Sequence, residues 1–401
     1  MSSGKVISIQ DYTYHLAEER IAKYPLPDRD QSKLLIYQDG KINEDIFRNI
    51  ERYIPERSSL FYNNTRVIQA RLLFTKSSGA QIEVFCLTPY SPSEYQSIFI
   101  QTEKCVWSCM IGNLKKWKSG KLLLNITING AGVILEAEKI GTEEKNTLVS
   151  FTWSGGYNFG EILNEIGCIP IPPYLHRNSE LIDKDRYQTV YSKQEGSVAA
   201  PTAGLHFTRD VLEKLDKKQV SKFEITLHIG AGTFQPVKSD NILEHEMHSE
   251  FFTVTRQFLE TFPDLSRPLI ATGTTTLRAL ESLYWLAVKS IVNDKLINKL
   301  DQWDYTNLPS TMPVKDAFKG LLRLMDLSRL NNYSATTQIM IIPGYDFKMV
   351  DGLITNFHQP KSTLILLVAA FVGVNWKDIY NYAGENNFRY LSYGDSSLLW
   401  R

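Results

Sequence analysis

Two histidines lie in segments where glycine could let the backbone come close to a ligand. His206 follows Ala203-Gly204-Leu205, and His228 comes directly before Ile229-Gly230. Glycine has no side chain to hold a bound molecule away, and a neutral imidazole can accept a proton near pH 7. Each segment could therefore bring a ligand close to a histidine. For the first segment the simpler alternative, a tight turn with His206 packed beside it, stays open.

A second group of polar residues comes directly after the predicted strand 269–272. Gly273-Thr274-Thr275-Thr276 leads into a predicted helix from Leu277 to Val292, with Arg278 in its first turn. Free backbone amides, hydroxyl groups and a guanidinium suit a carboxylate or a phosphate. The alternative is a threonine that caps the helix, with a surface arginine beside it.

A third group follows the predicted strand 353–357. Asn356, His358 and Lys361 stand at the end of this strand, beside a strongly apolar helix. In α/β architecture, ligands collect where strands end, so we expect these side chains to contact a ligand.

Metal and dinucleotide sites are less well supported. His245 and His248 are three residues apart, which does not meet the zinc spacing HExxH, so we expect no metal. A substrate-contacting loop and a solvated acidic turn are the two alternatives for this segment. Gly230 and Gly232 lack the third glycine and the later acidic residue of a dinucleotide site, so we exclude that fold.

A lysine-rich segment could contact nucleic acid. Lys115, Lys116, Trp117 and Lys118 are consecutive, and cations next to an aromatic ring suit a phosphate backbone and a stacked base. Lysines that protect an exposed strand edge are the equal alternative.

The elements that must position these residues predict an α+β protein. Residues 71–153 are mostly strand, with a hairpin signal at Asn129-Gly130, and indicate a small antiparallel β domain inserted within a larger unit. The larger unit, formed by 1–70 and 154–401, contains strand–loop–helix repeats. Residues 293–337 break the strand–loop–helix rhythm of this large domain, so we predict a surface insertion with one or two helices there.

Composition excludes several classes of protein. The 401 residues carry 44 basic and 44 acidic side chains, so any RNA site must be local. Four scattered cysteines indicate reduced thiols in the cytoplasm. The longest apolar run, Leu364–Val374, is shorter than the roughly 18 residues that a membrane span needs. We therefore expect a cytoplasmic protein without a membrane segment.

Motifs along nearly the whole chain resemble one known family, the S-adenosylmethionine:tRNA ribosyltransferase-isomerases of queuosine biosynthesis. The matching stretches are 11–12, 21–30, 64–67, 169–174, 185–191, 196–208, 227–237, 245–250, 273–278, 355–364 and 392–395. Their number and order make the resemblance specific. Four positions depart from the family pattern: Asn64 replaces an aspartate, Gln359 a leucine, and Ser396-Ser397 an alanine-methionine pair. The segment 293–337 is also longer than the usual connector of the family.

The resemblance implies an α+β fold, with a large α/β-barrel-like domain of residues 1–70 and 154–401 interrupted by a small antiparallel β-barrel of residues 71–153. It also implies a reaction that the residues alone do not. The ribosyl part of S-adenosylmethionine moves to 7-aminomethyl-7-deazaguanine at the wobble position of tRNA and is isomerised to epoxyqueuosine, while adenine and methionine leave. S-adenosylmethionine is a consumed substrate, so no other cofactor is implied. We expect tRNA and S-adenosylmethionine as partners and a monomeric protein. The alternatives are a paralogue with another acceptor, a non-catalytic tRNA-binding protein and a metallohydrolase.

The resemblance also suggests roles for the residues. His206 or His228 would be the base, and Lys115, Lys116, Trp117 and Lys118 would contact tRNA. The remaining candidates would bind substrate: Arg66, Thr202, Gly204, Gly230, Gly232, Thr233, Thr274, Thr275, Arg278, Asn356, His358, Lys361, Tyr393 and Asp395.

Overall fold

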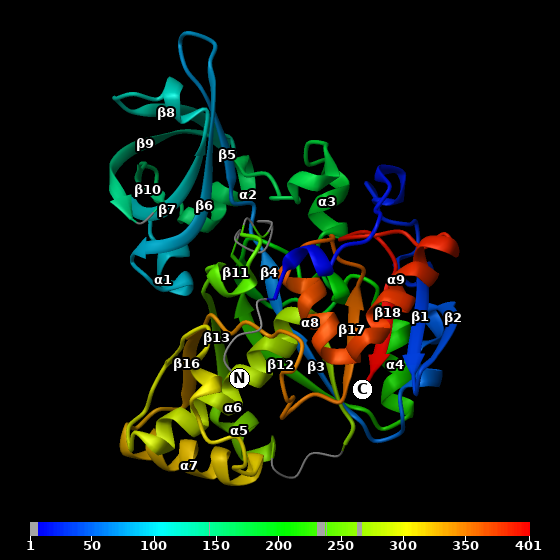
Figure 1. Cartoon of the computed structure of the whole chain (residues 1–401). Coiled ribbons are helices and arrows are strands. Elements are labelled where there is room, and N and C mark those ends of the chain that lie inside the picture. Colours follow the sequence, from blue (N-terminus) through cyan, green and yellow to red (C-terminus); the bar gives the residue numbers. More distant parts are fainter. Residues whose placement is uncertain (1–6, 144, 231–236, 238, 263–266) are drawn as a thin grey trace.

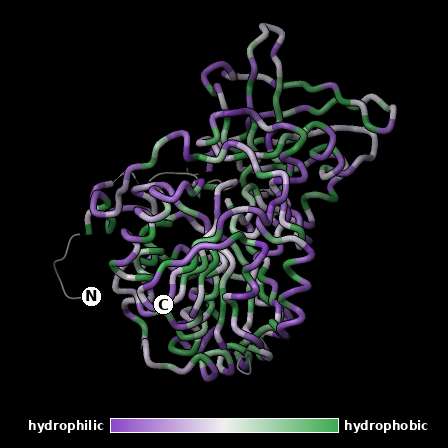
Figure 2. The backbone as a smooth tube through the Cα atoms, turned by 90° about the vertical axis from the view of Figure 1, so that its right-hand side faces the viewer, coloured by the Kyte–Doolittle hydropathy of each residue, from purple (hydrophilic) through white to green (hydrophobic). Residues whose placement is uncertain are grey.

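The computed structural model describes residues 7–143, 145–230, 237, 239–262 and 267–401. It has a mixed α/β architecture, with a small β body that projects from one end of a larger body (Figure 1). The same two bodies are seen after a 90° turn in Figure 2. The strand-rich region predicted at residues 71–153 is therefore separate in space from the strand–loop–helix region.

The small body is a six-stranded antiparallel sheet in the order β5-β6-β7-β10-β9-β8. Its outer strands, β5 and β8, approach each other, so the sheet is a nearly closed barrel. The predicted hairpin is confirmed, because Asn129 and Gly130 both have positive φ and join β8 to β9. The strands are β5 Arg71–Thr75, β6 Gln81–Ser91, β7 Lys104–Gly112, β8 Leu122–Ile128, β9 Ala131–Glu143 and β10 Asn146–Thr152.

The large body is built on a mixed sheet of ten strands, in the order β15-β16-β13-β12-β3-β14-β17-β18-β1-β2. Its edge strands are β15 and β2. The bounds are β1 Lys33–Gln38, β2 Lys41–Ile46, β3 Ser59–Asn63, β12 Ser221–His228, β13 Glu250–Thr255, β14 Leu269–Thr272, β15 Lys299–Leu300, β16 Asn332–Thr337, β17 Gly352–Asn356 and β18 Ser396–Trp400. A separate parallel pair joins β4 Thr65–Val67 to β11 Gln194–Ser197.

Four neighbouring strands of the large sheet, β12, β3, β14 and β17, run parallel. Strands β3, β14 and β17 are buried along their whole length, as expected for parallel strands covered on both faces. Their carboxyl ends all lie at one edge of the sheet. Loops that are far apart in the sequence therefore meet there.

Helices cover the sheet and begin near this edge. Helix α6 starts at Thr274, three residues before the predicted start, because Gly273 with φ 92° turns the chain directly from β14 into the helix. The helices are α1 Tyr95–Phe99, α2 Phe159–Ile166, α3 Leu181–Arg186, α4 Arg209–Lys217, α5 Arg256–Thr261, α6 Thr274–Val292, α7 Val314–Leu327, α8 Thr363–Val372 and α9 Trp376–Glu385.

The segment 293–337 differs from the predicted surface insertion. It supplies strands β15 and β16 to the large sheet, and β16 pairs with β13 over six residues. Its helix α7 buries Ala317, Phe318 and Leu321 in the main core. Strand β16 and helix α7 expose polar side chains on one face and bury apolar side chains on the other. The exposed faces account for the polar composition that predicted a surface insertion.

One helical stretch in the described residues, Thr363–Glu385, is long and apolar enough to cross a membrane by length and composition. It consists of α8, a short 3-10 turn and α9, and 56% of its most apolar window is buried inside the protein. Ile365, Leu367 and Val368 of α8 belong to the main hydrophobic core. Its apolar character is thus accounted for by packing within the chain.

Candidate active site

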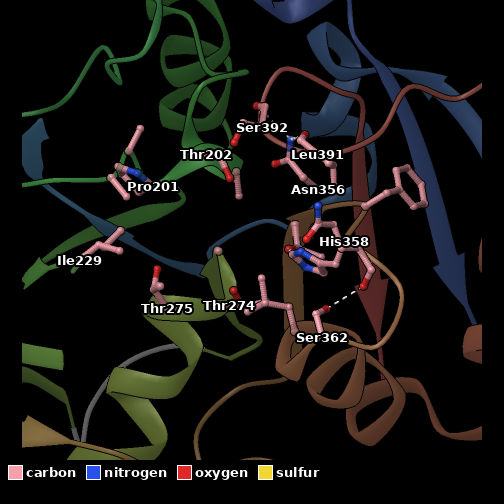
Figure 3. A pocket seen from close by; sticks show the side chains of 18 of the residues that line it. Pro201, Thr202, Ile229, Thr274, Thr275, Asn356, His358, Ser362, Leu391 and Ser392 are labelled. Carbon is pink, nitrogen blue, oxygen red and sulfur yellow. Dashed lines mark hydrogen bonds between the residues drawn. The ribbon is translucent and has the colours of Figure 1, made fainter. Parts of the chain in front are cut away.

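A pocket of about 100 Å³ lies at the carboxyl ends of β14 and β17. It gathers six segments that are distant in sequence, and Figure 3 shows labelled side chains from five of them around one space. The lining residues are Tyr174, Ala199, Ala200, Pro201, Thr202, Ala203, Ile229, Gly273, Thr274, Thr275, Thr355, Asn356, Phe357, His358, Gln359, Pro360, Ser362, Thr363, Leu364, Leu391 and Ser392. Of the predicted substrate-binding residues, Thr202, Thr274, Thr275, Asn356 and His358 meet here.

Two helices begin at this pocket. The backbone N–H of Gly273 donates to the carbonyl oxygen of Ile354 at 2.8 Å, which holds the start of α6 against β17. The hydroxyl of Ser362 caps α8 by accepting from the N–H of Ile365. The first turn of a helix has unpaired amides and a partial positive charge. The pocket wall formed by Thr274, Thr275 and Thr363 therefore favours an anionic or hydroxyl-bearing ligand.

His358 is held firmly in the pocket wall. Its Nε2 lies 3.0 Å from the hydroxyl of Thr355, and its backbone N–H donates to the hydroxyl of Tyr380 at 3.1 Å. The hydroxyl of Tyr14 donates to its carbonyl oxygen. Burial lowers the pKa of His358 to about 3, because the charged imidazole would lose its hydration. At neutral pH this side chain is an uncharged imidazole at the pocket.

Asn356 links the pocket to the C-terminal motif. Its Nδ2 donates to the carbonyl oxygen of Leu391 at 2.9 Å, and its side chain also interacts with the imidazole of His206. Ser392, next to Leu391, shares a 2.5 Å hydrogen bond with the hydroxyl of Tyr174. Tyr174 and Ser392 were not singled out from the sequence. Both lie in stretches that resemble the family, which was the only available signal.

His206 lies behind this pocket. It is 4% exposed, and its Nδ1 lies 2.8 Å from the Ser32 hydroxyl. Burial lowers its pKa to about 4, although its interaction with the Asn356 side chain opposes this effect. His206 is therefore neutral at pH 7. It lines a separate small cavity with Ser392 and Tyr393.

His228 lies elsewhere, in a large groove of about 1170 Å³ between the two bodies. Its Nδ1 donates to the carbonyl oxygen of Gly196 at 3.0 Å, and its ring stacks on Tyr95 from the small body. Burial lowers its pKa. The two histidines that the sequence paired as candidate bases are thus in different cavities. Tyr95 was not anticipated, because nothing in its local sequence distinguishes it.

The predicted role of Arg278 in holding a ligand is not supported by its position. The side chain is buried, does not line the pocket, and forms an ion pair with the buried carboxylate of Glu250. Its Nε donates to the carbonyl oxygen of Ile339 at 3.2 Å. Arg278 lies on the same face of α6 as Thr274 and Thr275, but one turn further along the helix. At that level its side chain contacts Glu250 and Ile339 in the core.

Three other predicted ligands, Gly204, Asp395 and Tyr393, make close contacts within the protein. Gly204 has no room for a side chain, since an added Cβ would lie 2.0 Å from the Tyr191 hydroxyl. Asp395 is buried and accepts from the backbone amides of Lys33 and Arg389. The hydroxyl of Tyr393 donates to Asp183 at 2.7 Å.

The remaining predicted ligands lie away from the pocket. Lys361 is exposed and Gly230 is half-buried, and neither lines it. Arg66 is exposed and lines a separate cavity of about 190 Å³. Gly232 and Thr233 lie outside the described residues.

In the lysine-rich segment, the structure separates the lysines from the tryptophan. Trp117 is 1% exposed and its Nε1 donates to the carbonyl oxygen of Gly120 at 2.9 Å. The Nζ of Lys139 lies over its ring. The prediction that a base stacks on Trp117 is therefore wrong, because the indole is part of the barrel core. Lys115, Lys116 and Lys118 are exposed.

The structure also locates the His245–Glu250 segment and two positions that depart from the family pattern, Asn64 and Gln359. Among the described residues, no three His, Cys, Asp or Glu side chains could hold a metal ion together. The Nε2 of His248 lies 3.4 Å from Glu250. Asn64, where the family pattern has aspartate, donates to Glu224 at 3.0 Å, a contact in which a second carboxylate would be repelled. Gln359 lines the pocket.

Comparison with known proteins agrees with the motif pattern. A family model described as queuosine biosynthesis protein matches residues 9–399. A protein named S-adenosylmethionine:tRNA ribosyltransferase-isomerase from Halothermothrix orenii is 35% identical over 400 residues, covering 98% of this chain and 100% of the relative. One of the same name from Carboxydothermus hydrogenoformans is 35% identical over 399 residues, with 98% and 100% coverage.

A solved structure is also similar. The crystal structure of S-adenosylmethionine tRNA ribosyltransferase from Thermotoga maritima is 25% identical, and the match covers 97% of this chain and 99% of that one. Its TM-score of 0.46 is too low to locate residues by superposition. The full-length family match and the two relatives are sufficient by themselves. This chain belongs to the queuosine biosynthesis protein family.

Proposed function

We propose that this protein is an S-adenosylmethionine:tRNA ribosyltransferase-isomerase. It transfers and isomerises the ribosyl part of S-adenosylmethionine onto 7-aminomethyl-7-deazaguanine at the wobble position of tRNA, and adenine and methionine leave. The family match over residues 9–399 and the two relatives of that name support the reaction. The structural observation that carries the site is the single pocket where Thr202, Thr274 and His358 meet.

The pocket supplies features that the substrate needs. S-adenosylmethionine has a carboxylate and ribose hydroxyls, which suit the first turns of α6 and α8 at Thr274, Thr275 and Thr363. The amide of Asn356 lines the pocket, and its Oδ1 has two lone pairs that can accept from a nucleoside N–H or O–H. Arg278 would act as a positioning residue, because its ion pair with Glu250 anchors α6 from below.

The reaction begins when a proton leaves the carbon beside the sulfonium, so it needs a base that is uncharged at neutral pH. His206 and His228 are the candidates from the sequence, and both are neutral imidazoles. His358 becomes a third candidate. It is the only one of these three imidazoles that lines the pocket, and its Nε2 is already engaged by Thr355.

We also infer the domain organisation and the setting of the protein. Residues 71–153 contain the whole six-stranded sheet, which supports an inserted domain within a large α/β domain of 1–70 and 154–401. All four cysteines are free thiols, which is consistent with the reducing cytoplasm. We propose a monomer that uses no cofactor besides its consumed substrate. Light scattering coupled to size-exclusion chromatography tests the oligomeric state.

Liquid chromatography of the reaction products tests the proposed function. The purified protein is incubated with S-adenosylmethionine and tRNA that carries the deazaguanine precursor. We expect adenine release and epoxyqueuosine in that tRNA. Adenine release without the precursor-bearing tRNA would indicate a paralogue with another acceptor. Binding of tRNA without any adenine release would indicate a non-catalytic RNA-binding protein.

A further inference from the structure

A second, smaller cavity of about 20 Å³ lies beside the candidate active site, and Ser392 lines both. Three arginines, Arg29, Arg186 and Arg389, line this cavity. Among its described lining residues there is no aspartate or glutamate. The cavity is therefore a concentration of positive charge in a protein whose formal net charge is +0.

Two of these arginines have no carboxylate partner among the described ion pairs. Arg29 donates to the carbonyl oxygens of Gln188 at 2.9 Å and Asp185 at 3.4 Å. Arg186 donates to the carbonyl oxygens of Pro27 at 2.9 Å and Leu26 at 2.6 Å. A carbonyl oxygen accepts a hydrogen bond but does not neutralise the charge.

The third arginine is partly compensated. Arg389 pairs with Asp395 at 3.1 Å. The cavity therefore has three guanidinium groups. Asp395 pairs with one of them, and the charge of Asp185 also acts on Arg29.

The carbonyl contacts fix the two unpaired guanidiniums in space. Each arginine holds the backbone of the segment that carries the other, so neither side chain has to be ordered when a ligand arrives. A guanidinium has five N–H donors, and two contacts leave the others for a ligand. The pKa of Arg29 is lowered by burial and then by the nearby charge of Arg186. A bound anion would offset both effects.

His206 lines the same cavity, and its imidazole interacts with the Asn356 side chain at the neighbouring pocket. When the Ser32 hydroxyl donates to Nδ1, Nε2 carries the proton and becomes a donor. In that tautomer His206 is held between the two cavities rather than acting as the base.

We propose that Arg29, Arg186 and Arg389 form a binding site for a substrate oxyanion. The proposal rests on the proposed function, because the site adjoins the pocket assigned to S-adenosylmethionine. Two oxyanions share the required chemistry: a phosphate of the tRNA strand beside the wobble nucleotide, and the carboxylate of S-adenosylmethionine. Guanidinium groups bind both in a bidentate manner.

Charge-removing and charge-keeping variants test this site. Arg29→Gln and Arg186→Gln remove the charge, whereas Arg29→Lys and Arg186→Lys keep it but lose the forked geometry. Arg20→Gln is the matched control, because Arg20 also donates to a backbone carbonyl, that of Gly384, but does not line this cavity. Thermal unfolding establishes that each variant is folded before kinetics are measured.

Two measurements distinguish the sources of the oxyanion. If the ligand is a tRNA phosphate, each glutamine variant raises the KM for precursor-bearing tRNA roughly tenfold to a hundredfold. Each also lowers the salt slope, which is the slope of the logarithm of the tRNA binding constant against the logarithm of the salt concentration, by about one in magnitude. If it is the carboxylate, wild type prefers S-adenosylmethionine over its decarboxylated analogue, and the glutamine variants lose that preference by a similar factor. A merely structural role would not change this preference.

The outcomes separate this proposal from the proposed function. The oxyanion site is overturned if the folded glutamine variants behave like Arg20→Gln in three respects. These are the KM for precursor-bearing tRNA, the salt slope of tRNA binding, and the preference for S-adenosylmethionine over its decarboxylated analogue. If neither glutamine variant folds, the same measurements on the lysine variants decide, with a smaller change in the same direction expected. Failure of wild type to release adenine with precursor-bearing tRNA would instead overturn the proposed function.

Discussion

The imidazole of His228 lies flat on the ring of Tyr95, with centroids 4.2 Å apart and planes 5° apart. His228 ends β12 in the large sheet, whereas Tyr95 begins α1 of the small body. Gly196 completes the contact, because its carbonyl oxygen accepts from Nδ1 of His228. Three segments are thus joined where the two bodies meet, and Nε2 of His228 is left as the basic nitrogen.

This contact predicts that Gly196 cannot be replaced without cost. Its φ is 130°, and an added Cβ would lie 2.7 Å from both His228 Nδ1 and Tyr95 Cδ1. We expect Gly196→Ala to lower the free energy of unfolding by about 1–3 kcal/mol, measured by urea denaturation. Gly384→Ala is the control, since its Cβ would make only an ordinary contact at 3.8 Å. Equal stability of the two variants would contradict this account of the contact.

Single-turnover rates of adenine release should identify the base. We expect His358→Ala to lower this rate by roughly 10²- to 10⁴-fold, the usual contribution of a general base. Of the three candidate imidazoles, His358 alone lines the pocket. His206→Ala and His228→Ala should have smaller effects. Near-wild-type rates for both would exclude the base assignment made from the sequence, whereas a full loss in either would exclude His358.

The buried histidines predict a loss of stability in acid. The pKa of His206 is lowered to about 4 in the folded protein, against about 6.5 when unfolded. Between these values the unfolded state binds more protons. The stabilisation is therefore complete above pH 6.5 and is lost as the pH falls towards 4.

Between pH 6.5 and 4, a buried histidine such as His206 should make the free energy of unfolding fall by about 1.4 kcal/mol for each unit that the pH is lowered. Urea unfolding between pH 7.5 and 5 measures it. His206→Asn should reduce the slope, whereas His15→Asn, at an exposed position, should not. An unchanged slope in His206→Asn would show that this imidazole is not buried in its neutral form.

The ion pair between Arg278 and Glu250 predicts a structural role for the arginine. Arg278→Ala leaves a buried carboxylate without its partner, so we expect about 3–5 kcal/mol of destabilisation in urea unfolding. Arg323→Ala, which breaks an exposed ion pair with Asp294, should cost less than about 1 kcal/mol. At temperatures where Arg278→Ala is folded, an increase of a hundredfold or more in the KM for S-adenosylmethionine would contradict the positioning role.

Local sequence was most informative where short-range rules decide the structure. Asn129-Gly130 predicted the turn between β8 and β9, because both residues tolerate positive φ. The strand ends at Thr272 and Asn356 predicted where polar loops would meet. Side-chain direction was harder to anticipate. Arg278 and Trp117 both carry chemically suitable groups, but packing turns one to Glu250 and the other into the barrel core.

The sequence by itself determined the family, the order of strands and helices in most segments, and the loops that carry polar residues. These depend on motifs and on hydrophobic periodicity, which are local properties of the chain. Only the tertiary structure decided that His358 lines the pocket with Thr274, that His206 and His228 are in different cavities, and that Arg29 and Arg186 lie together. Each of these relationships joins residues far apart in sequence, and their distances are set by how the parallel strands pair and how the helices pack on them.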